Sequence, residues 1–198
     1  MATDIAKVIA NLTSVYDFRG KSVVHAGAGG GQLVGYATTA RHVVAIDPDA
    51  EAVVRLRAAI EALGLGDRFT VRQAEFESVA DQADVVFFEF CLHEMGDPDA
   101  VLRHARTLAP ETLVIDHAPE SRWAWHCAET LKAQRSWDAV ERAGIRVDRR
   151  FVGRQLFPNV EALVTRLESL GEPAVSRARD FGEATDIDIE MIYGVAVL

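Results

Sequence analysis

The order of apolar runs along the chain constrains its fold more than any other feature. Five short runs rich in β-branched and aromatic residues predict strands within residues 21–27, 41–49, 68–74, 83–90 and 112–119. Stretches with helical spacing or helix-capping residues separate them at 30–40, 49–65 and 97–110. Because the strand runs are continuously apolar and alternate with helices, they predict a parallel sheet covered on both faces.

The last third of the chain follows a different pattern. A long, mostly polar stretch at 120–144 predicts one continuous helix, and 158–171 predicts a shorter helix with Pro158 and Asn159 at its entry. Residues 145–157 fit a strand, a loop or both. Two further stretches, 173–181 and 188–198, predict two final strands with turn residues between them.

Composition excludes several classes of protein. Of 198 residues, 49% are apolar and 26% charged, which is typical of a globular domain. The net charge of −9 disfavours nucleic acid or an anionic membrane as the main partner. No apolar run approaches the roughly 20 residues of a membrane span, and residues 1–20 are interpreted as a helix rather than a signal peptide. Cys91 and Cys127 fit neither a zinc spacing nor a disulfide framework, so we expect a cytoplasmic protein.

A glycine cluster follows the first predicted strand, with four glycines within residues 27–31. Glycine inside regular structure costs about 0.5–1 kcal/mol relative to alanine, so the cluster indicates a place where a ligand approaches the backbone at the start of a helix. Asp47 ends the second predicted strand, where a carboxylate can accept hydrogen bonds from ribose hydroxyls. Together these features predict a nucleoside-containing ligand.

The spacing of Gly27, Gly29 and Gly31 resembles motif I of the class I S-adenosylmethionine-dependent methyltransferases, acidic-x-Gly-x-Gly-x-Gly. A dinucleotide-binding fingerprint would need a third glycine at the place of Gln32. The resemblance extends over residues 20–118 and returns in the final strand. It implies an α/β fold with a Rossmann-like, doubly wound sheet of seven strands, mostly parallel with an antiparallel last strand.

The same resemblance implies how one domain, 1–198, is divided and what it binds. Residues 1–118 would form the cofactor-binding half, and 119–198 would supply the acceptor-side helices and last strands. The implied cofactor is S-adenosyl-L-methionine, with S-adenosyl-L-homocysteine as its product. We expect a small-molecule acceptor, without nucleic acid or membrane as partner.

Individual cofactor contacts follow from segments that resemble the family. "AIDPD" resembles the ribose-binding segment, with Asp47 and Pro48. "VRQAEFES" resembles the adenine-binding segment, in which Glu75 would meet the amino group and Phe76 would border the ring. Glu89, at the end of the fourth predicted strand, would lie beside the methionine group of the cofactor.

His25 stands where the family's motif I usually carries an acidic residue. Its imidazole could hydrogen-bond the methionine carboxylate or pack in the interior. This departure from the motif keeps open a protein that binds the cofactor without turnover.

The chemistry of methyl transfer narrows the search for catalytic residues. A sulfonium is already activated, so the protein must align the acceptor and exclude water, and a base is required only for a hydroxyl or ammonium acceptor. His93 is the first candidate because an imidazole titrates near neutral pH, although it could instead cap a backbone carbonyl. His117 is the second candidate, with a supporting hydrogen bond as the alternative. Glu94 and Asp116 lie next to them in the sequence.

One face of the predicted helix at 120–144 carries an unusual mixture of side chains. By helical spacing this face holds Trp123, His126, Cys127, Thr130, Gln134 and Trp137. It could form a wall of the acceptor pocket, with indoles stacking on a flat or cationic substrate, or lie half-buried in the domain or at the interface of a homodimer. Four arginines, Arg146, Arg149, Arg150 and Arg154, could meet an anionic acceptor or pair with carboxylates.

A metal site has no support from sequence spacing. His93, Glu94, His117, His126 and Cys127 could meet only through the fold, and we expect no metal. The sequence therefore predicts methyl transfer from S-adenosylmethionine to a small-molecule O, N or S nucleophile. The alternatives are a non-catalytic nucleoside-sensing or scaffold protein and, less favoured, an NAD-dependent oxidoreductase.

Overall fold

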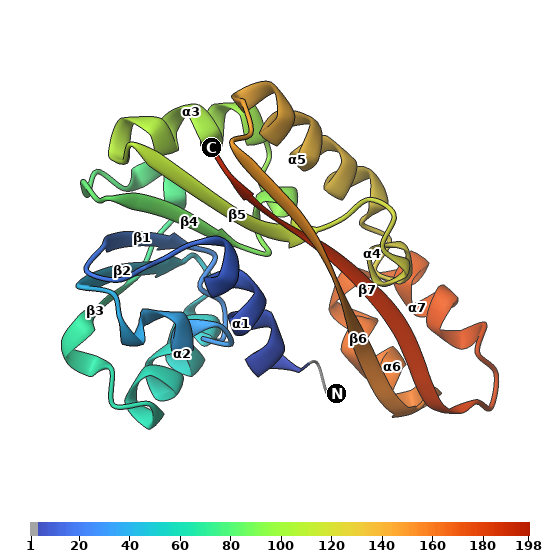
Figure 1. Cartoon of the computed structure of the whole chain (residues 1–198). Coiled ribbons are helices and arrows are strands. Elements are labelled where there is room, and N and C mark those ends of the chain that lie inside the picture. The colour runs from blue at the N-terminus through green and yellow to red at the C-terminus, as the bar shows by residue number, and fades with distance from the viewer. Residues whose placement is uncertain (1–3) are drawn as a thin grey trace.

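The computed structural model describes residues 4–198, which fold around one seven-stranded sheet (Figure 1). The strands are β1 (Ser22–Ala26), β2 (His42–Asp47), β3 (Phe69–Gln73), β4 (Val85–Glu89), β5 (Glu111–His117), β6 (Val147–Asn159) and β7 (Thr185–Val197). They lie in the order β3-β2-β1-β4-β5-β7-β6. The first five pair in parallel, whereas β7 runs antiparallel between β5 and β6. The predicted fold class, including its antiparallel last strand, is confirmed.

Helices cover both faces of this sheet. They are α1 (Ile5–Val15), α2 (Ala50–Ala62), α3 (Pro98–Leu108), α4 (Arg122–His126), α5 (Thr130–Ala143), α6 (Val160–Leu167) and α7 (Glu172–Arg179). Two of the predicted helix starts are capped as expected, because Asp97 accepts a hydrogen bond from Ala100 N at 3.0 Å and Asn159 accepts one from Ala162 N at 2.9 Å.

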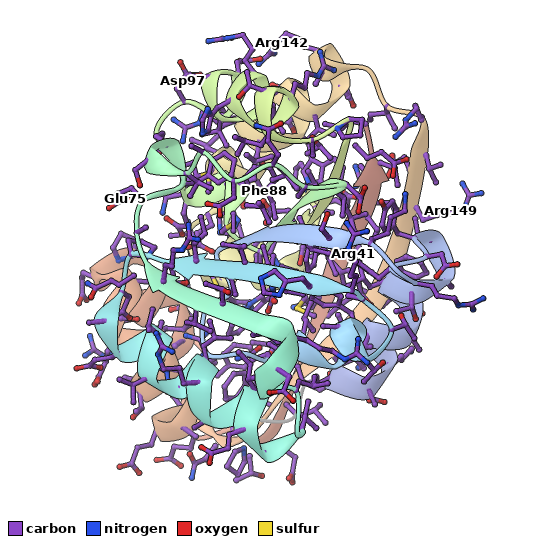
Figure 2. The ribbon with its side chains drawn as sticks, turned by 90° about the vertical axis from the view of Figure 1, so that its left-hand side faces the viewer. Arg41, Glu75, Phe88, Asp97, Arg142 and Arg149 are labelled. Carbon is purple, nitrogen blue, oxygen red and sulfur yellow. The ribbon has the colours of Figure 1, made fainter. Side chains whose placement is uncertain are left out.

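Alternating strand residues divide the core into two apolar layers. On β4, Phe87 belongs to the layer that also receives side chains from α1 and α2, and Phe88 to the layer that receives them from α3 and α5. Both phenylalanines are fully buried. Figure 2 shows Phe88 in the interior, with charged residues such as Arg41 and Arg149 at the periphery. The apolar runs of the central strands are thus explained by burial on two sides.

The helix predicted at 30–40 is wrong. This segment contains only a short 3₁₀ helix, Val34–Thr38, after a glycine turn. Three glycines, a valine and two threonines give residues 30–40 low helix propensity. The glycine turn therefore has no long helix behind it.

The single helix predicted at 120–144 is also wrong. Ala128 has a positive φ of 62° and separates α4 from α5. Ser121 caps α4 through a hydrogen bond from Ala124 N at 3.4 Å, and Glu129 N then bonds back to Ala124 O at 2.8 Å. This break brings Glu129 into the interior, where its side chain is buried.

The strand predicted at 173–181 is in fact α7. Pro173 occupies the first turn of this helix, a position where its missing N–H costs nothing. Ala174, Val175 and Ala178 then form its buried face. The stretch at 145–157, which fitted a strand or a loop, belongs to β6.

The hairpin of β6 and β7 extends beyond the parallel strands (Figure 1). Each strand has 13 residues, and α6 and α7 lie between them in the sequence. The C-terminal part of β7 pairs with β5 as well, as in the pair Ile115–Val195, whereas the projecting part pairs with β6 alone, as in Gln155–Ile189. Within residues 4–198, no helix has the length and apolar character needed to cross a membrane.

Candidate active site

The glycine turn after β1 is held by close packing on both sides. Gly27 and Gly31 have positive φ values of 64° and 77°. A Cβ at Gly27 would overlap Cys91, and a Cβ at Gly31 would lie 2.7 Å from the Cβ of Ala59 on α2. Gly29, between them, donates its N–H to Asp47 Oδ2 at 2.8 Å. Side chains are therefore excluded from a turn whose backbone faces the carboxyl ends of β1 and β4.

A first cavity, of about 400 Å³, lies along the ends of β2 and β3. Asp47, Pro48, Glu75 and Phe76 all line it, together with Gly27. Asp47 Oδ1 accepts a hydrogen bond from Asp49 N at 2.9 Å while Oδ2 accepts the one from Gly29. Each carboxylate oxygen keeps a second lone pair, so this carboxylate can still accept hydrogen bonds from a ligand. The structure thus brings together the ribose-side and adenine-side residues predicted from the sequence.

Glu89 and His25 form a buried pair behind the glycine turn. Their atoms Oε2 and Nε2 lie 2.9 Å apart, and His25 Nδ1 lies 3.2 Å from the hydroxyl of Tyr36. Burial raises the pKa of Glu89, although the His25 ring opposes that shift. Glu89 lines a second cavity, whereas His25 is fully buried and stacks on Phe87. Of the two roles considered for His25, the structure favours packing: both ring nitrogens face protein groups rather than the cavity.

The second cavity, of about 330 Å³, adjoins the first, because Gly27 and Glu94 line both. Its walls come from the loops after β1, β4 and β5, the break between α4 and α5, the projecting hairpin and α6. The lining residues include Gly29, Glu89, His93, Glu94, His117, Trp123, Cys127, Glu129, Gln155, Arg166 and Met191. This cavity therefore lies at the place where an acceptor would meet the reactive end of a cofactor held in the first.

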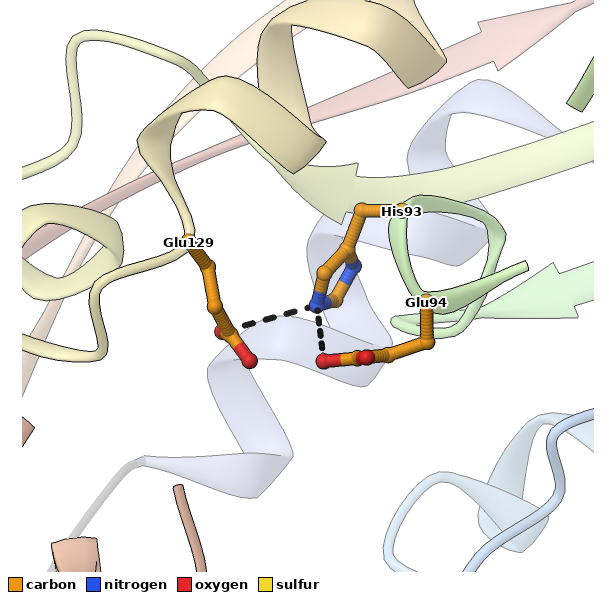
Figure 3. Close-up of side chains that lie close together, drawn as sticks. All are labelled: His93, Glu94 and Glu129. Carbon is orange, nitrogen blue, oxygen red and sulfur yellow. Dashed lines mark ion pairs between the residues drawn. The ribbon is translucent and has the colours of Figure 1, made fainter. Parts of the chain in front are cut away.

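His93 is the centre of a cluster of carboxylates in the second cavity (Figure 3). Its Nδ1 lies 2.6 Å from Asp116 Oδ1, and its backbone N–H donates to Asp116 Oδ2 at 2.9 Å. Its Nε2 lies 3.4 Å from Glu94 Oε1 and 3.5 Å from Glu129 Oε2. Lys132 Nζ contacts Glu94 Oε2 at 2.7 Å from outside. Asp116 is fully buried and fixes the orientation of the ring.

The surroundings of His93 bear on its role as a proton acceptor, which stays a prediction. Burial alone lowers the pKa of His93, but Asp116, Glu129 and Glu94 together raise it to about 12. A ring with so high a pKa holds its proton at neutral pH, which does not favour that role. By contrast, burial lowers the pKa of His117 to about 4. His117 is therefore neutral, and its buried Nδ1 has no hydrogen-bond partner among the described residues.

Most of the other residues considered from the sequence lie apart from the cavities. Of the mixed helix face, Trp123 and Cys127 line the second cavity, whereas Gln134 is exposed and His126 lies against Phe181. Trp137 is buried below Arg150, whose guanidinium carbon lies 3.7 Å from a ring centroid of the indole. Arg146 and Arg154 pair with Glu111 and Asp188. Of the two roles proposed for the arginines, pairing with carboxylates is the one observed for these two.

Three polar residues are among those of the second cavity that sequence reasoning missed: Glu129, Gln155 and Arg166. Glu129 reaches the cavity only because the chain breaks at Ala128, which no residue pattern signals. Gln155 lies on a strand whose register was not predicted. Its Oε1 has no hydrogen-bond partner within residues 4–198, although the side chain is only 7% exposed.

The first part of the chain matches a known protein family. Residues 24–112, which run from β1 into β5, match the family model of a methyltransferase domain. This segment is a methyltransferase domain. It contains the glycine turn, Asp47 and His93, so the residues that build the first cavity belong to the matched segment. No curated protein matches the chain closely enough to count as a relative.

Solved structures show the same fold over nearly the whole chain. A Bacillus halodurans protein taken to be a methyltransferase is 16% identical, with a TM-score of 0.68 over 98% of this chain and 97% of its own. A SAM-dependent methyltransferase from Aquifex aeolicus is 20% identical, with a TM-score of 0.59 over 98% and 89%. Magnesium protoporphyrin IX methyltransferase from Synechocystis, with S-adenosylhomocysteine bound, is 16% identical, with a TM-score of 0.58 over 97% and 80%. The prediction of a class I methyltransferase is confirmed by the domain and the fold together.

Proposed function

We propose that this methyltransferase transfers the methyl group of S-adenosylmethionine to a small-molecule acceptor. The observation that carries the proposal is the pair of adjoining cavities that share Gly27 and Glu94. The first has the residues expected around a nucleoside, and the second is of the size at the lower end of small-molecule sites, which span about 300–1,000 Å³. The first would hold the nucleoside of the cofactor, and the second would hold the acceptor and, beside Glu89, the methionine end of the cofactor.

The residues of the first cavity fit the cofactor. The bare backbone of the glycine turn leaves room for close approach, and the free lone pairs of Asp47 can accept hydrogen bonds from ribose hydroxyls. Phe76 is held in place by Phe88, with ring centroids 4.9 Å apart, and can border a flat base. When bound, the cofactor supplies an activated methyl group on a sulfonium. The chain's own task is to orient that group toward the second cavity and to exclude water.

The second cavity suits an acceptor that needs little help from a base. The carboxylates around His93 raise its pKa and burial lowers the pKa of His117 to about 4, so neither ring is poised to accept a proton near neutral pH. A thiolate or a neutral amine attacks a sulfonium without first losing a proton to the protein. Trp123 and Met191 supply apolar walls that keep water away from the reacting atoms. We therefore place a small thiol or amine first among the acceptor classes.

Location and partners remain part of the proposal. The two free cysteines agree with a reducing cytoplasm, and the net charge of −9 agrees with a function that involves neither nucleic acid nor anionic membrane. A homodimer stays a prediction.

The test has two stages. Calorimetry should show that S-adenosylhomocysteine binds one site per chain and that NAD does not. A panel of thiols, amines, phenols and carboxylic acids is then incubated with the protein and S-adenosylmethionine, and products 14 mass units heavier are sought by mass spectrometry. Methylated product from a thiol or amine supports the proposal. Binding without any product would favour the nucleoside-sensing or scaffold alternative, and binding of NAD alone would favour the oxidoreductase.

A further inference from the structure

The cluster around His93 has the composition of a metal site rather than of an ordinary ion pair. The nitrogen His93 Nε2 and one carboxylate oxygen each from Glu94 and Glu129 all lie within 4.8 Å of one another. The three residues come from two places that are far apart in the sequence, the loop after β4 and the start of α5. Three carboxylates, counting Asp116, surround a single imidazole, and Lys132 is the other cation in contact with them.

The distances fit metal ligands better than hydrogen bonds. Nε2 lies 3.4 Å from Glu94 Oε1 and 3.5 Å from Glu129 Oε2, whereas N–H···O hydrogen bonds usually measure about 2.7–3.2 Å. Ligands that sit about 2.0–2.2 Å from a tetrahedral ion are about 3.3–3.5 Å apart from one another. The spacing from Nε2 to both oxygens thus matches two edges of such a coordination shell.

The orientation of His93 also fits a metal ligand. A histidine that binds a metal through one nitrogen usually donates its other N–H to a carboxylate or carbonyl. Here Asp116 Oδ1 lies 2.6 Å from Nδ1, and Asp116 itself is fixed by the backbone N–H groups of His93 and His117 at 2.9 and 2.8 Å. This arrangement places Nε2 toward the two glutamates (Figure 3).

A second, independent observation indicates that the cavity is built for a ligand. Gln155, on β6, lines the same cavity, and only 7% of its surface is exposed. Its Oε1 has no hydrogen-bond partner among residues 4–198. A buried amide oxygen without a partner is unfavourable, so a polar group of a bound ligand is expected to meet it.

We infer that His93, Glu94 and Glu129 bind a divalent first-row transition-metal ion, such as Zn²⁺ or Mn²⁺, in the second cavity. Binding replaces the proton on Nε2 and displaces the ammonium group of Lys132, whose side chain is 45% exposed and free to move to solvent. The remaining coordination positions face the cavity, where an oxygen, nitrogen or sulfur atom of a bound small molecule can occupy one of them. The role of the ion beside an acceptor rests on the proposed function, but metal binding itself does not.

The inference is tested with the metal alone. Zn²⁺ and Mn²⁺ are titrated into the tag-free full chain by calorimetry, and Co²⁺ is added in parallel because its visible absorption reports ligand type and geometry. We expect one ion per chain. Glu129→Gln should weaken binding at least tenfold, and Asp116→Asn should weaken it by about 10–100-fold. Glu141→Gln is the matched control, since this exposed glutamate on the same helix α5 lies outside the cluster.

A second kind of variant is expected to raise the metal affinity rather than lower it. Lys132→Met removes the competing ammonium, so metal should bind more tightly, whereas a purely structural ion-pair cluster gives no metal response to this change. The inference would be overturned if none of the three ions bound one-to-one. It would also be overturned if the wild type, Glu129→Gln and Lys132→Met bound metal with equal affinity. S-adenosylhomocysteine is titrated into the same samples: cofactor binding without metal binding contradicts only this site, and metal binding without cofactor binding contradicts only the proposed function.

Discussion

The two cavities of this methyltransferase domain are built in different ways. The first is made by the turns that directly follow β1, β2 and β3 together with the loop after β4, and backbone groups help to shape it, as in the bond from Gly29 N to Asp47. The second is made by side chains from the loops of β4 and β5, the α4–α5 break and the projecting hairpin. A site of the first kind can be predicted from short local sequence motifs. A site of the second kind depends on how distant segments pack, and it is where one methyltransferase can differ from another.

The largest expected effect is a loss of stability when the buried carboxylate beside His93, Asp116, is changed. Asp116→Asn removes the charge that faces His93 in a fully buried place. Breaking such a pair costs about 3–5 kcal/mol, and urea unfolding should show that loss. Asp188→Asn, which breaks the pair of Asp188 with Arg154 on the surface, is the control and should leave the urea midpoint nearly unchanged. Equal effects of the two changes would contradict the view that the cluster organises the interior.

The glycine turn offers the corresponding test of the first cavity. Gly27→Ala forces a Cβ into Cys91 at a positive φ, and such overpacking costs about 1–3 kcal/mol. The change should also lower the affinity for S-adenosylhomocysteine, because the turn must shift. Gly64→Ala has nearly the same φ, 65° against 64°, but nothing within 4 Å of the new Cβ. A thermal melting temperature that falls equally in both variants would show that backbone strain, rather than packing against β4, decides the effect.

A smaller and more specific effect is expected at Asp47. In Asp47→Asn an amide group replaces one carboxylate oxygen that accepts a backbone N–H and, as proposed, a ribose hydroxyl. We expect a loss of about 1–3 kcal/mol in cofactor binding, roughly ten- to a hundred-fold in affinity. Asp49→Asn is the matched control, because asparagine can still cap α2 at this exposed position. Calorimetry with S-adenosylhomocysteine measures both, and an unchanged Asp47→Asn would remove Asp47 from the ribose site.

The smallest effect is a pH dependence of stability that arises at Glu89, in the wall of the second cavity. Burial raises the pKa of this carboxyl above its usual value of 4.5. The folded state therefore holds this proton more tightly than the unfolded state, and the contribution of Glu89 to stability falls as pH rises through the window between its unfolded and its raised folded pKa. Glu89→Gln cannot ionise, so its free energy of unfolding should fall less than that of the wild type from pH 4.5 upward. A parallel fall in both proteins would contradict the raised pKa.

Sequence reasoning reached much further in the first cavity than in the second. The five central strands, the glycine turn and the places of Asp47, Glu75 and Phe76 follow from patterns within short segments, because parallel strands bring their carboxyl ends to one edge. Even there, the helix expected after the turn is only a short 3₁₀ helix, because the residues of that segment have low helix propensity.

Two features of the chain after β5 have no local signal, and the first of them shapes the second cavity. Ala128 adopts a left-handed conformation that is rare for alanine, and this break alone turns Glu129 inward. The stretch at 173–181 has apolar spacing that fits either a short strand or a short helix, and tertiary packing selects the helix. His93 was found from its place after β4, but its pKa depends on two residues distant in the sequence. Asp116 lies 23 residues away, and Glu129 lies beyond the next strand, β5.

The central claim is that the two cavities hold the two reactants side by side, and a crystal structure with S-adenosylhomocysteine tests it most directly. We predict that the ribose lies against Asp47, that the adenine lies between Glu75 and Phe76, and that the sulfur points past Gly27 into the cavity lined by His93 and Glu129. Adenosine in the second cavity, or a ligand bound away from the glycine turn, would contradict the account.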